Sequence, residues 1–183
     1  MKNQIQMKKN IITIGGSNSK TSITKALAEY TGRLISNIEI TNIDLNDFEM
    51  EMYSIDVENE KGHPVGAKDL NAIFDKADGF VICLAEHNGV YSVAFKNVLD
   101  WLSRLENKVW RNVPMLLLSA TPGERGGITL LNIAKDRFPY LGANIIGSMA
   151  FPSFYDNFKE GEVINAELKE ELQSLVSEFA EAI

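Results

Sequence analysis

Hydroxyl side chains are concentrated in one short stretch, residues 15–22, which reads Gly-Gly-Ser-Asn-Ser-Lys-Thr-Ser and contains no carboxylate. An apolar run at residues 11–14 precedes it, and an apolar pattern of helical spacing begins at Ile23. Glycines let the backbone approach a ligand closely, and a helix N-terminus presents free N–H groups with a partial positive charge. A strand, a tight loop and a helix in this order predict a phosphate site.

The spacing of the glycines and hydroxyl residues in this loop limits the kinds of phosphate ligand that it could bind. It lacks the GxxxxGK[ST] of a P-loop and the GxGxxG of a dinucleotide-binding fold. The hydroxyls of Ser17, Ser19, Thr21 and Ser22 are suited to surrounding a phosphate monoester. The alternative is a polar turn in which Ser22 or Thr21 simply caps the following helix. The loop alone leaves both interpretations open.

Two further loops have a similar character. Residues 85–92 follow the unbroken apolar run 80–84, and residues 120–127 follow the apolar run 115–119. Both loops carry glycines, hydroxyls or amides, and both precede a helical pattern. Unbroken apolar runs of this length are typical of central parallel strands buried on both faces.

The order of these elements predicts the architecture. We expect five strands alternating with helices, with the strands at residues 10–15, 38–43, 80–84, 115–119 and 144–151. This alternation predicts an α/β protein with helices on both faces of a parallel sheet. Five strands fit the doubly wound, flavodoxin-like order 2-1-3-4-5, in which ligands bind at the carboxyl ends of the strands beside the reversal of strand order. The three loops described above all lie there. We expect one domain over residues 1–183, with residues 1–9 as a polar tail.

Two features leave their roles open. Residues 44–66 form a long, acidic and irregular stretch, and long loops in compact domains are usually functional or disordered. Its Met50, Met52 and Tyr53 are expected either to cover a ligand or meet a second subunit, or to belong to a mobile surface excursion. Trp101 lies beside the main apolar stripe of its helix, which suggests a subunit interface or a lone, partly buried tryptophan.

Composition excludes several classes of function. The formal charge of −7 over 183 residues argues against nucleic acid and anionic membranes as partners, because both select basic patches. No apolar run approaches the ~20 residues that cross a bilayer, and the first ten residues lack the apolar core of a signal peptide. The single cysteine, Cys83, lies in an apolar run and is expected to be a core thiol. We therefore expect a cytoplasmic protein without a Cys/His zinc site.

Three segments give the chain a resemblance to a known family. Residues 16–22 resemble a G-S-x-R-x-x-S phosphate loop, and residues 86–89 followed by 95–103 resemble P-E-Y-N-G and then L-K-N-A-I-D-W-L-S. Residues 123–127 resemble a glycine-rich third loop. On these motifs the chain resembles the NAD(P)H-dependent FMN reductases of the flavodoxin-like superfamily, which include azoreductases and quinone or chromate reductases.

The resemblance implies bound FMN and hydride transfer from NAD(P)H through the flavin to a small acceptor such as a quinone, an azo compound or free flavin. It also implies a homodimer or homotetramer. The implied phosphate ligands are Ser17, Asn18, Ser19 and Ser22 with the amides of Ile23 and Thr24. The residues implied to border the flavin ring are Ala85, Glu86, His87 and Asn88, and those at its pyrimidine edge are Ser119, Thr121, Gly123 and Gly126. No catalytic side chain is implied, because the cofactor carries the redox chemistry.

The chain departs from the family pattern at three positions. Ser19 stands where the family often has arginine, which removes one positive charge from the phosphate loop. Ala85 and His87 replace the proline and tyrosine of the second loop. His87 is expected to fill the tyrosine position as a planar ring, with proton donation to the acceptor as the alternative. Two competing functions stay open, an electron carrier of the flavodoxin type and a flavin-free binding module.

Overall fold

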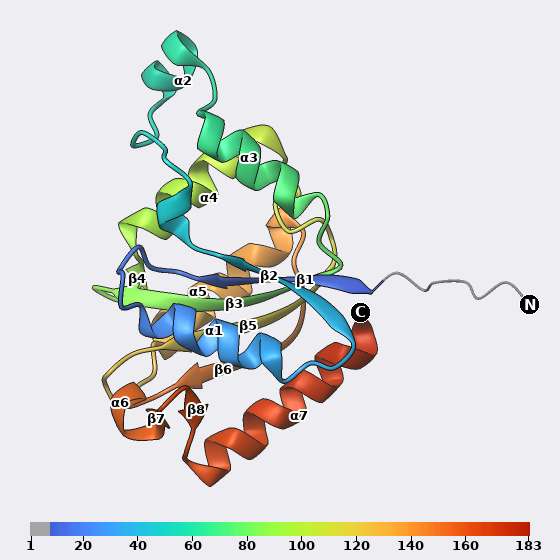
Figure 1. Cartoon of the computed structure of the whole chain (residues 1–183). Coiled ribbons are helices and arrows are strands. Elements are labelled where there is room, and N and C mark those ends of the chain that lie inside the picture. The colour runs from blue at the N-terminus through green and yellow to red at the C-terminus, as the bar shows by residue number, and fades with distance from the viewer. Residues whose placement is uncertain (1–7) are drawn as a thin grey trace, which may run out of the picture.

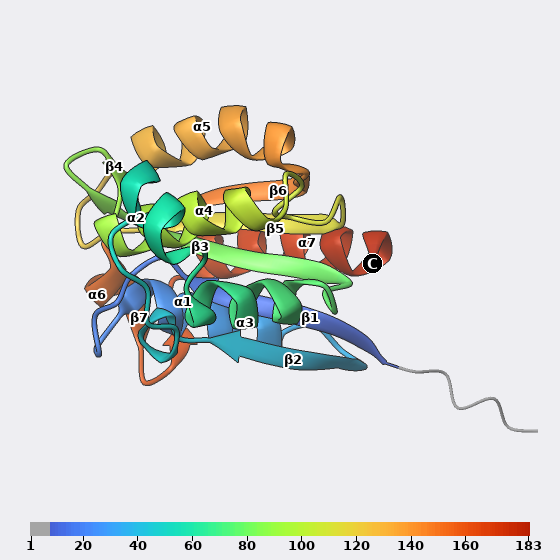
Figure 2. The ribbon, with the colours of Figure 1, turned by 90° about the horizontal axis from the view of Figure 1, so that it is seen from above.

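The centre of the molecule is a parallel sheet of five strands with helices on both faces (Figures 1 and 2). The computed structural model describes residues 8–183. The parallel strands are β1 (Lys9–Gly15), β2 (Ile38–Ile43), β3 (Gly79–His87), β5 (Pro114–Ala120) and β6 (Asn144–Phe151). They run in the order β2-β1-β3-β5-β6, so the predicted flavodoxin-like order and parallel direction are confirmed.

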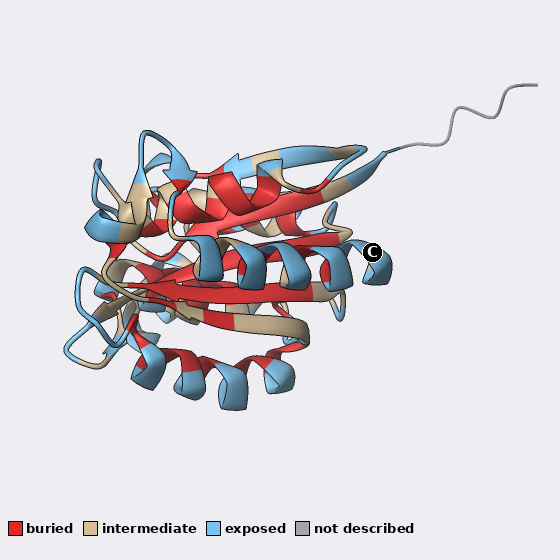
Figure 3. Cartoon of the chain, turned by 90° about the horizontal axis from the view of Figure 1, so that it is seen from below, coloured by how far each residue is buried: buried red, intermediate tan, exposed pale blue. Residues whose placement is uncertain are grey.

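The helices divide between the two faces of this sheet. One face packs against α1 (Ile23–Arg33) and α7 (Ala166–Ala182). The other face packs against α3 (Val65–Phe74), α4 (Val93–Leu105) and α5 (Ile128–Arg137). Figure 3 shows the buried residues gathered on the sheet and on the helix sides that face it.

Strand β3 is covered on both faces and contributes to both hydrophobic cores. Its residues alternate between the two cores: Phe80, Ile82 and Leu84 belong to one, and Val81 and Cys83 to the other. All five are 0–1% exposed, as an unbroken apolar run predicts for a strand covered on both faces. Cys83 is a core thiol, and burial raises the pKa of that thiol far above its ordinary value.

The second loop is largely a hairpin, which corrects the prediction of a loop at residues 85–92. Strand β3 continues to His87 and pairs antiparallel with the short β4 (Val90–Tyr91). The turn residues Asn88 and Gly89 have φ values of 53° and 82°. An Asn-Gly pair is the preferred sequence for such a two-residue turn, because both positions need positive φ.

Residues 44–66 are more ordered than the prediction of an irregular stretch. They contain η1 (Leu45–Asp47) and α2 (Ile55–Lys61), and in Figure 1 α2 projects from the body of the molecule. The Ser54 hydroxyl accepts the amide of Val57 at 3.1 Å and caps α2. Local capping forms this short helix without the long apolar stripe by which helices are recognised in sequence.

Trp101 is more buried than either alternative considered from the sequence, a subunit interface or a lone, partly buried tryptophan. It is fully buried by its own chain, and its indole Nε1 donates to the Glu51 carbonyl at 2.8 Å. Its ring meets Tyr53 edge to face, with centroids 5.0 Å apart. Asn97 accepts the Tyr53 amide at 2.8 Å. Helix α4 therefore anchors residues 51–53.

The remaining differences lie at the start of the chain and between β6 and α7. The sequence prediction omitted α6 (Phe154–Asn157) and a ribbon of β7 (Phe158–Lys159) with β8 (Glu162–Val163). The predicted tail falls mostly on residues 1–7, outside the described part, while Lys9 already belongs to β1. Within residues 8–183, no helix combines the length and apolar character needed to cross a bilayer.

Candidate functional site

The loop after β1, the last three residues of β3 and the end of β5 with the loop that follows it border one cavity of about 250 Å³ at the carboxyl ends of these strands. Its lining also includes one residue from α6. The lining residues are Ser17, Ser19, Thr21, Ser22, Ile23, Thr24, Ala85, Glu86, His87, Ala120, Thr121, Pro122 and Tyr155. We call this space the loop cavity. It lies beside the reversal of strand order between β1 and β3, where ligands bind in doubly wound sheets.

Most of the predicted site residues come together in this lining, and the exceptions have identifiable places. Asn18 lines a second, neighbouring cavity. Asn88 is the exposed first residue of the hairpin turn. Ser119 and Gly126 are buried behind the third loop, and Gly123 is exposed on it.

The first loop is held by bonds among its own hydroxyls. Ser17 Oγ accepts the Ser19 amide at 3.1 Å, and Ser19 Oγ accepts the Thr21 amide at 3.3 Å. Ser22 caps α1 by accepting the Lys25 amide at 3.1 Å, so the capping role considered from the sequence is present. A serine that accepts within the loop still has its own O–H to donate. The first helical residues, Ile23 and Thr24, also have amides without an intrahelical acceptor.

One glycine, Gly16, and one serine, Ser92, fix this loop against the sheet. A Cβ on Gly16 would lie 3.0 Å from the Ala85 nitrogen, so the first loop lies directly against β3. The Gly16 amide donates to the Cys83 carbonyl at 2.7 Å. The Gly16 carbonyl accepts the buried Ser92 hydroxyl at 2.6 Å, and Ser92 also caps α4. The starts of α1 and α4 are therefore positioned together.

The third loop depends on Ser119. This residue is fully buried, and its hydroxyl donates to the Gly126 carbonyl at 2.7 Å. Gly126 has a φ of 60°, and a Cβ there would lie 2.8 Å from the Phe151 carbonyl carbon. Ser119 thus holds the loop in place rather than facing the loop cavity. Gly127, with a φ of 81°, caps the start of α5.

Sequence reasoning missed Ala120, Pro122 and Tyr155. The first two adjoin predicted residues of the third loop. Tyr155 is 64% exposed and follows Ser153, whose φ is 45°. Its position could have been anticipated, because β6 is also parallel and its carboxyl end reaches the same edge of the sheet.

A second cavity, of about 520 Å³, adjoins the first and shares His87 with it. Residues 45–52, the start of α4 and Asn18 surround it. Its lining is Asn18, Leu45, Asn46, Phe48, Glu49, Met50, Met52, His87, Ser92, Val93, Ala94, Asn97 and Val98. We call it the side cavity. Met50 and Met52 line this space. The sequence alone leaves open whether they cover a ligand, meet a second subunit or belong to a mobile surface excursion.

One ion pair joins α1 to Asp44, the first residue of the stretch 44–66. Lys25 Nζ lies 2.5 Å from Asp44 Oδ2, with both side chains partly exposed. The hydrogen bond with Asp44 raises the pKa of Lys25 against the opposing effect of burial. The same bond, with that from the Asn46 amide, lowers the pKa of Asp44. The pair therefore stabilises the fold between the acidic range of Asp44 and the basic range of Lys25.

We expect Asp44→Asn to lower the free energy of unfolding at pH 7 by about 0.5–1 kcal/mol, the range of a partly exposed pair. Asparagine can still accept the Asn46 amide, which Asp44 Oδ1 accepts at 2.9 Å, so mainly the charge is lost. The folded pKa of Asp44 is depressed, so this stability is present above its unfolded pKa of about 3.9 and is lost as pH falls through the folded value. Urea unfolding at neutral and acidic pH measures the difference from wild type, with Glu39→Gln as control. A difference that does not shrink in acid would contradict the assignment.

The amino-acid sequence is similar to those of known proteins. Residues 9–156 match the model of the family described as NADPH-dependent FMN reductase. The chain is 27% identical over 184 residues to a quinone reductase of Escherichia coli (strain K12), with 96% of each chain covered. It is 31% identical over 136 residues to an NADPH azoreductase of Bacillus sp. (strain OY1-2), covering 74% of this chain and 72% of the relative.

Solved structures show the same fold. The flavoenzyme NAD(P)H:(acceptor) oxidoreductase FerB of Paracoccus denitrificans superposes with a TM-score of 0.76 at 20% identity, covering 95% of this chain and 96% of FerB. An NADH:FMN oxidoreductase, EmoB, in its apo form gives a TM-score of 0.68 at 16% identity, covering 96% and 90%. The family match spans β1 through α6 and contains all of the loops that border the loop cavity. The chain therefore belongs to the NADPH-dependent FMN reductase family.

Proposed function

We propose that this protein is an FMN-containing reductase that passes hydride from NAD(P)H to a small acceptor such as a quinone, an azo compound or free flavin. The observation that carries the proposal is the meeting of the first loop, the end of β3 and the third loop around one cavity, at the edge of the sheet where such folds bind ligands. Family membership supports FMN and a nicotinamide nucleotide as the redox partners. The flavin supplies the hydride chemistry when bound, and the protein supplies placement and electrostatics.

The first loop suits the phosphate of FMN by its donor set. The hydroxyls of Ser17, Ser19 and Ser22 accept backbone N–H groups within the loop, and each also carries an O–H that can donate to an anion. The Ser22 hydroxyl lies 3.0 Å from that of Thr24, and either of the two can be the donor, so one O–H of this pair stays available. The amides of Ile23 and Thr24 add donors at the positive end of α1. The loop holds no carboxylate to repel the phosphate. Asn18 faces the side cavity and is proposed to contact the flavin from that side.

The other two loops are proposed to border the flavin ring. Ala85, Glu86 and His87 lie at the end of β3, and Asn88 contributes through the turn that follows them. Thr121 and Gly123 are proposed to flank the pyrimidine edge, while Ser119 and the buried Gly126, which are bound to each other, fix their loop from behind. We assign His87 a packing role beside the ring, because it lines both cavities.

A visible absorption spectrum tests this function. The purified protein is mixed with FMN, then with NADPH or NADH, and finally with a quinone. We expect the bound-flavin band to bleach with nucleotide and recover with the quinone. Binding of FMN without bleaching by either nucleotide would favour the electron carrier. Failure to bind FMN would contradict the proposed cofactor and favour a flavin-free binding module, and only the assignment of the fold would still stand.

Tyr155 is a further proposed contact of the cofactor. We expect Tyr155→Ala to weaken FMN binding about fivefold, the value of one modest interaction. Tyr140→Ala is the matched control, because Tyr140 is 72% exposed and lies away from the loop cavity on η2 (Phe138–Leu141). Flavin fluorescence titration gives both dissociation constants. Equal values for the two variants would remove Tyr155 from the site.

We further propose that the protein works in the cytoplasm as a homodimer or homotetramer. A single, fully buried thiol suits a reducing compartment. Met52, Ile55 and Val65 are exposed apolar side chains in or beside the projecting residues 44–66, where a second subunit could cover them. Light scattering of the purified protein measures the oligomeric state, and a monomer at micromolar concentration would contradict this proposal.

A further inference from the structure

The side cavity has the position and the lining of a site for the electron acceptor. It adjoins the loop cavity through His87, so a molecule inside it would lie next to a flavin bound by the three loops. Phe48, Met50 and Met52 give it apolar walls. Methionine side chains adapt to flat aromatic molecules of different outline. This position rests on the proposed function.

The side cavity is lined by a negatively charged residue and by no lysine or arginine. Glu49 is the only carboxylate among the residues that line the side cavity, and no lysine or arginine is among them. Glu49 is exposed, and the hydrogen bonds and ion pairs found within residues 8–183 give it no cationic partner. Its negative charge is therefore uncompensated by a neighbouring cation.

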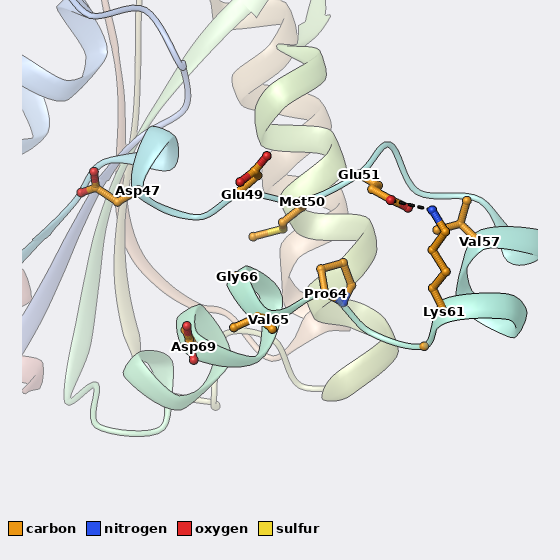
Figure 4. Close-up of a pocket in the computed structure, with 11 residues that line it drawn as sticks. Asp47, Glu49, Met50, Glu51, Val57, Lys61, Pro64, Val65, Gly66 and Asp69 are labelled. Atoms are coloured by element: carbon orange, nitrogen blue, oxygen red, sulfur yellow. Dashed lines mark hydrogen bonds and ion pairs between the residues drawn. The ribbon is translucent and has the colours of Figure 1, made fainter.

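The space on the other side of Glu49 reinforces this charge. A third cavity shares Glu49 and Met50 with the side cavity and is also lined by Asp47, Asp69 and Glu51. In Figure 4 the Glu49 side chain turns to the opposite side of its segment from Val65 and Asp69. The only cation in this lining, Lys61, is bound to Glu51 at 2.7 Å. An anion that approaches the side cavity or the third cavity therefore meets carboxylates, and the residues that line the two cavities offer it no unpaired lysine or arginine.

Contacts with α4 hold the backbone of residues 51–53, which lies just after Glu49. The Glu51 backbone carbonyl accepts from the buried Trp101 indole at 2.8 Å and from the Asn97 side-chain Nδ2 at 3.1 Å. Tyr53 is bound to Asn97 through its backbone and donates its hydroxyl to Glu58 at 3.0 Å. Glu49 lies two residues from the Glu51 anchor.

We propose that Glu49 is a specificity-determining residue that makes the acceptor site select neutral aromatic molecules over anionic ones of the same shape. Repulsion from an uncompensated carboxylate penalises a sulfonate or carboxylate on the acceptor and leaves a neutral ring unaffected. The effect weakens as salt is added, because the charge is exposed. The substrate class is therefore neutral aromatic acceptors, with sulfonated compounds disfavoured.

Equilibrium binding to the FMN-loaded protein tests this without turnover. The probes are naphthalene sulfonamide and naphthalene sulfonate, which match in size and differ in charge. The shifts of the Met50 and Met52 methyl resonances give both dissociation constants. We expect Glu49→Lys to move the ratio of the two constants toward the sulfonate by about tenfold and Glu49→Gln to move it by less. Glu178→Lys, an equal change of charge at an exposed position on α7, is expected to leave the ratio unchanged.

Kinetics provide a second measurement. The flavin is reduced photochemically and mixed with naphthoquinone or its sulfonated derivative, so that no nucleotide competes. Comparing the rate ratio between variants cancels the intrinsic reactivity of each quinone. A ratio that is the same in wild type and Glu49→Lys, or that Glu178→Lys shifts equally, would overturn the proposal while FMN binding stands. A protein that takes up no FMN would overturn the proposed function as well.

Discussion

Replacing Ser17 by aspartate is expected to weaken FMN binding about a hundredfold, so that the purified protein retains little of the cofactor. The new carboxylate would stand where the Ser17 hydroxyl now borders the loop cavity, against the phosphate in the proposed site. Two unit charges about 4 Å apart repel by about 4 kcal/mol at an effective dielectric constant near ~20. Allowing for the partial exposure of the loop, we expect a loss of about 3 kcal/mol, or roughly a hundredfold in the dissociation constant. Flavin fluorescence titration measures it.

Ser17→Asn is the matched control for this prediction. Asparagine has nearly the size of aspartate without its charge, and its side-chain oxygen can replace Ser17 Oγ as acceptor of the Ser19 amide. We expect it to retain FMN within about tenfold of wild type. Unchanged flavin occupancy in Ser17→Asp, with both variants folded, would refute the phosphate-loop assignment.

The parts of the fold that could be predicted are those governed by burial. A strand covered on both faces must be apolar throughout, and β3 from Phe80 to Leu84 meets this requirement in sequence and in structure. The alternation of strands and helices then limits the sheet to few orders. Because parallel strands end at one edge, the convergence of their loops followed from the topology.

The parts that could not be predicted depend on contacts between distant residues. Trp101 has an apolar side chain whose burial against Glu51 and Tyr53 has no local signal. The side chain of Ser119 looks available in sequence, yet its hydroxyl is bound to Gly126. The Asn88-Gly89 turn, by contrast, carried a local signal for a hairpin. A residue type therefore indicates what a side chain can do, whereas its partner decides what remains available.

Gly15→Ala is expected to have the largest effect on stability. A Cβ at this position would lie 2.4 Å from the Lys25 backbone nitrogen and 2.5 Å from its Cα. Both are backbone atoms of α1, so no side-chain rotation relieves the clash, and the helix must move away from β1. Overpacking of this kind costs about 3 kcal/mol. Urea unfolding of the flavin-free protein measures the loss.

The same substitution links the fold to the proposed site. Displacement of α1 moves the amides of Ile23 and Thr24, so the remaining folded protein should also bind FMN more weakly. Gly123→Ala is the control for stability, because a Cβ there meets only Thr121 Oγ1, at 3.9 Å. Equal unfolding free energies for the two alanine variants would mean that β1 and α1 are not packed this closely. Loss of stability with normal FMN affinity would instead mean that phosphate binding does not depend on the position of α1.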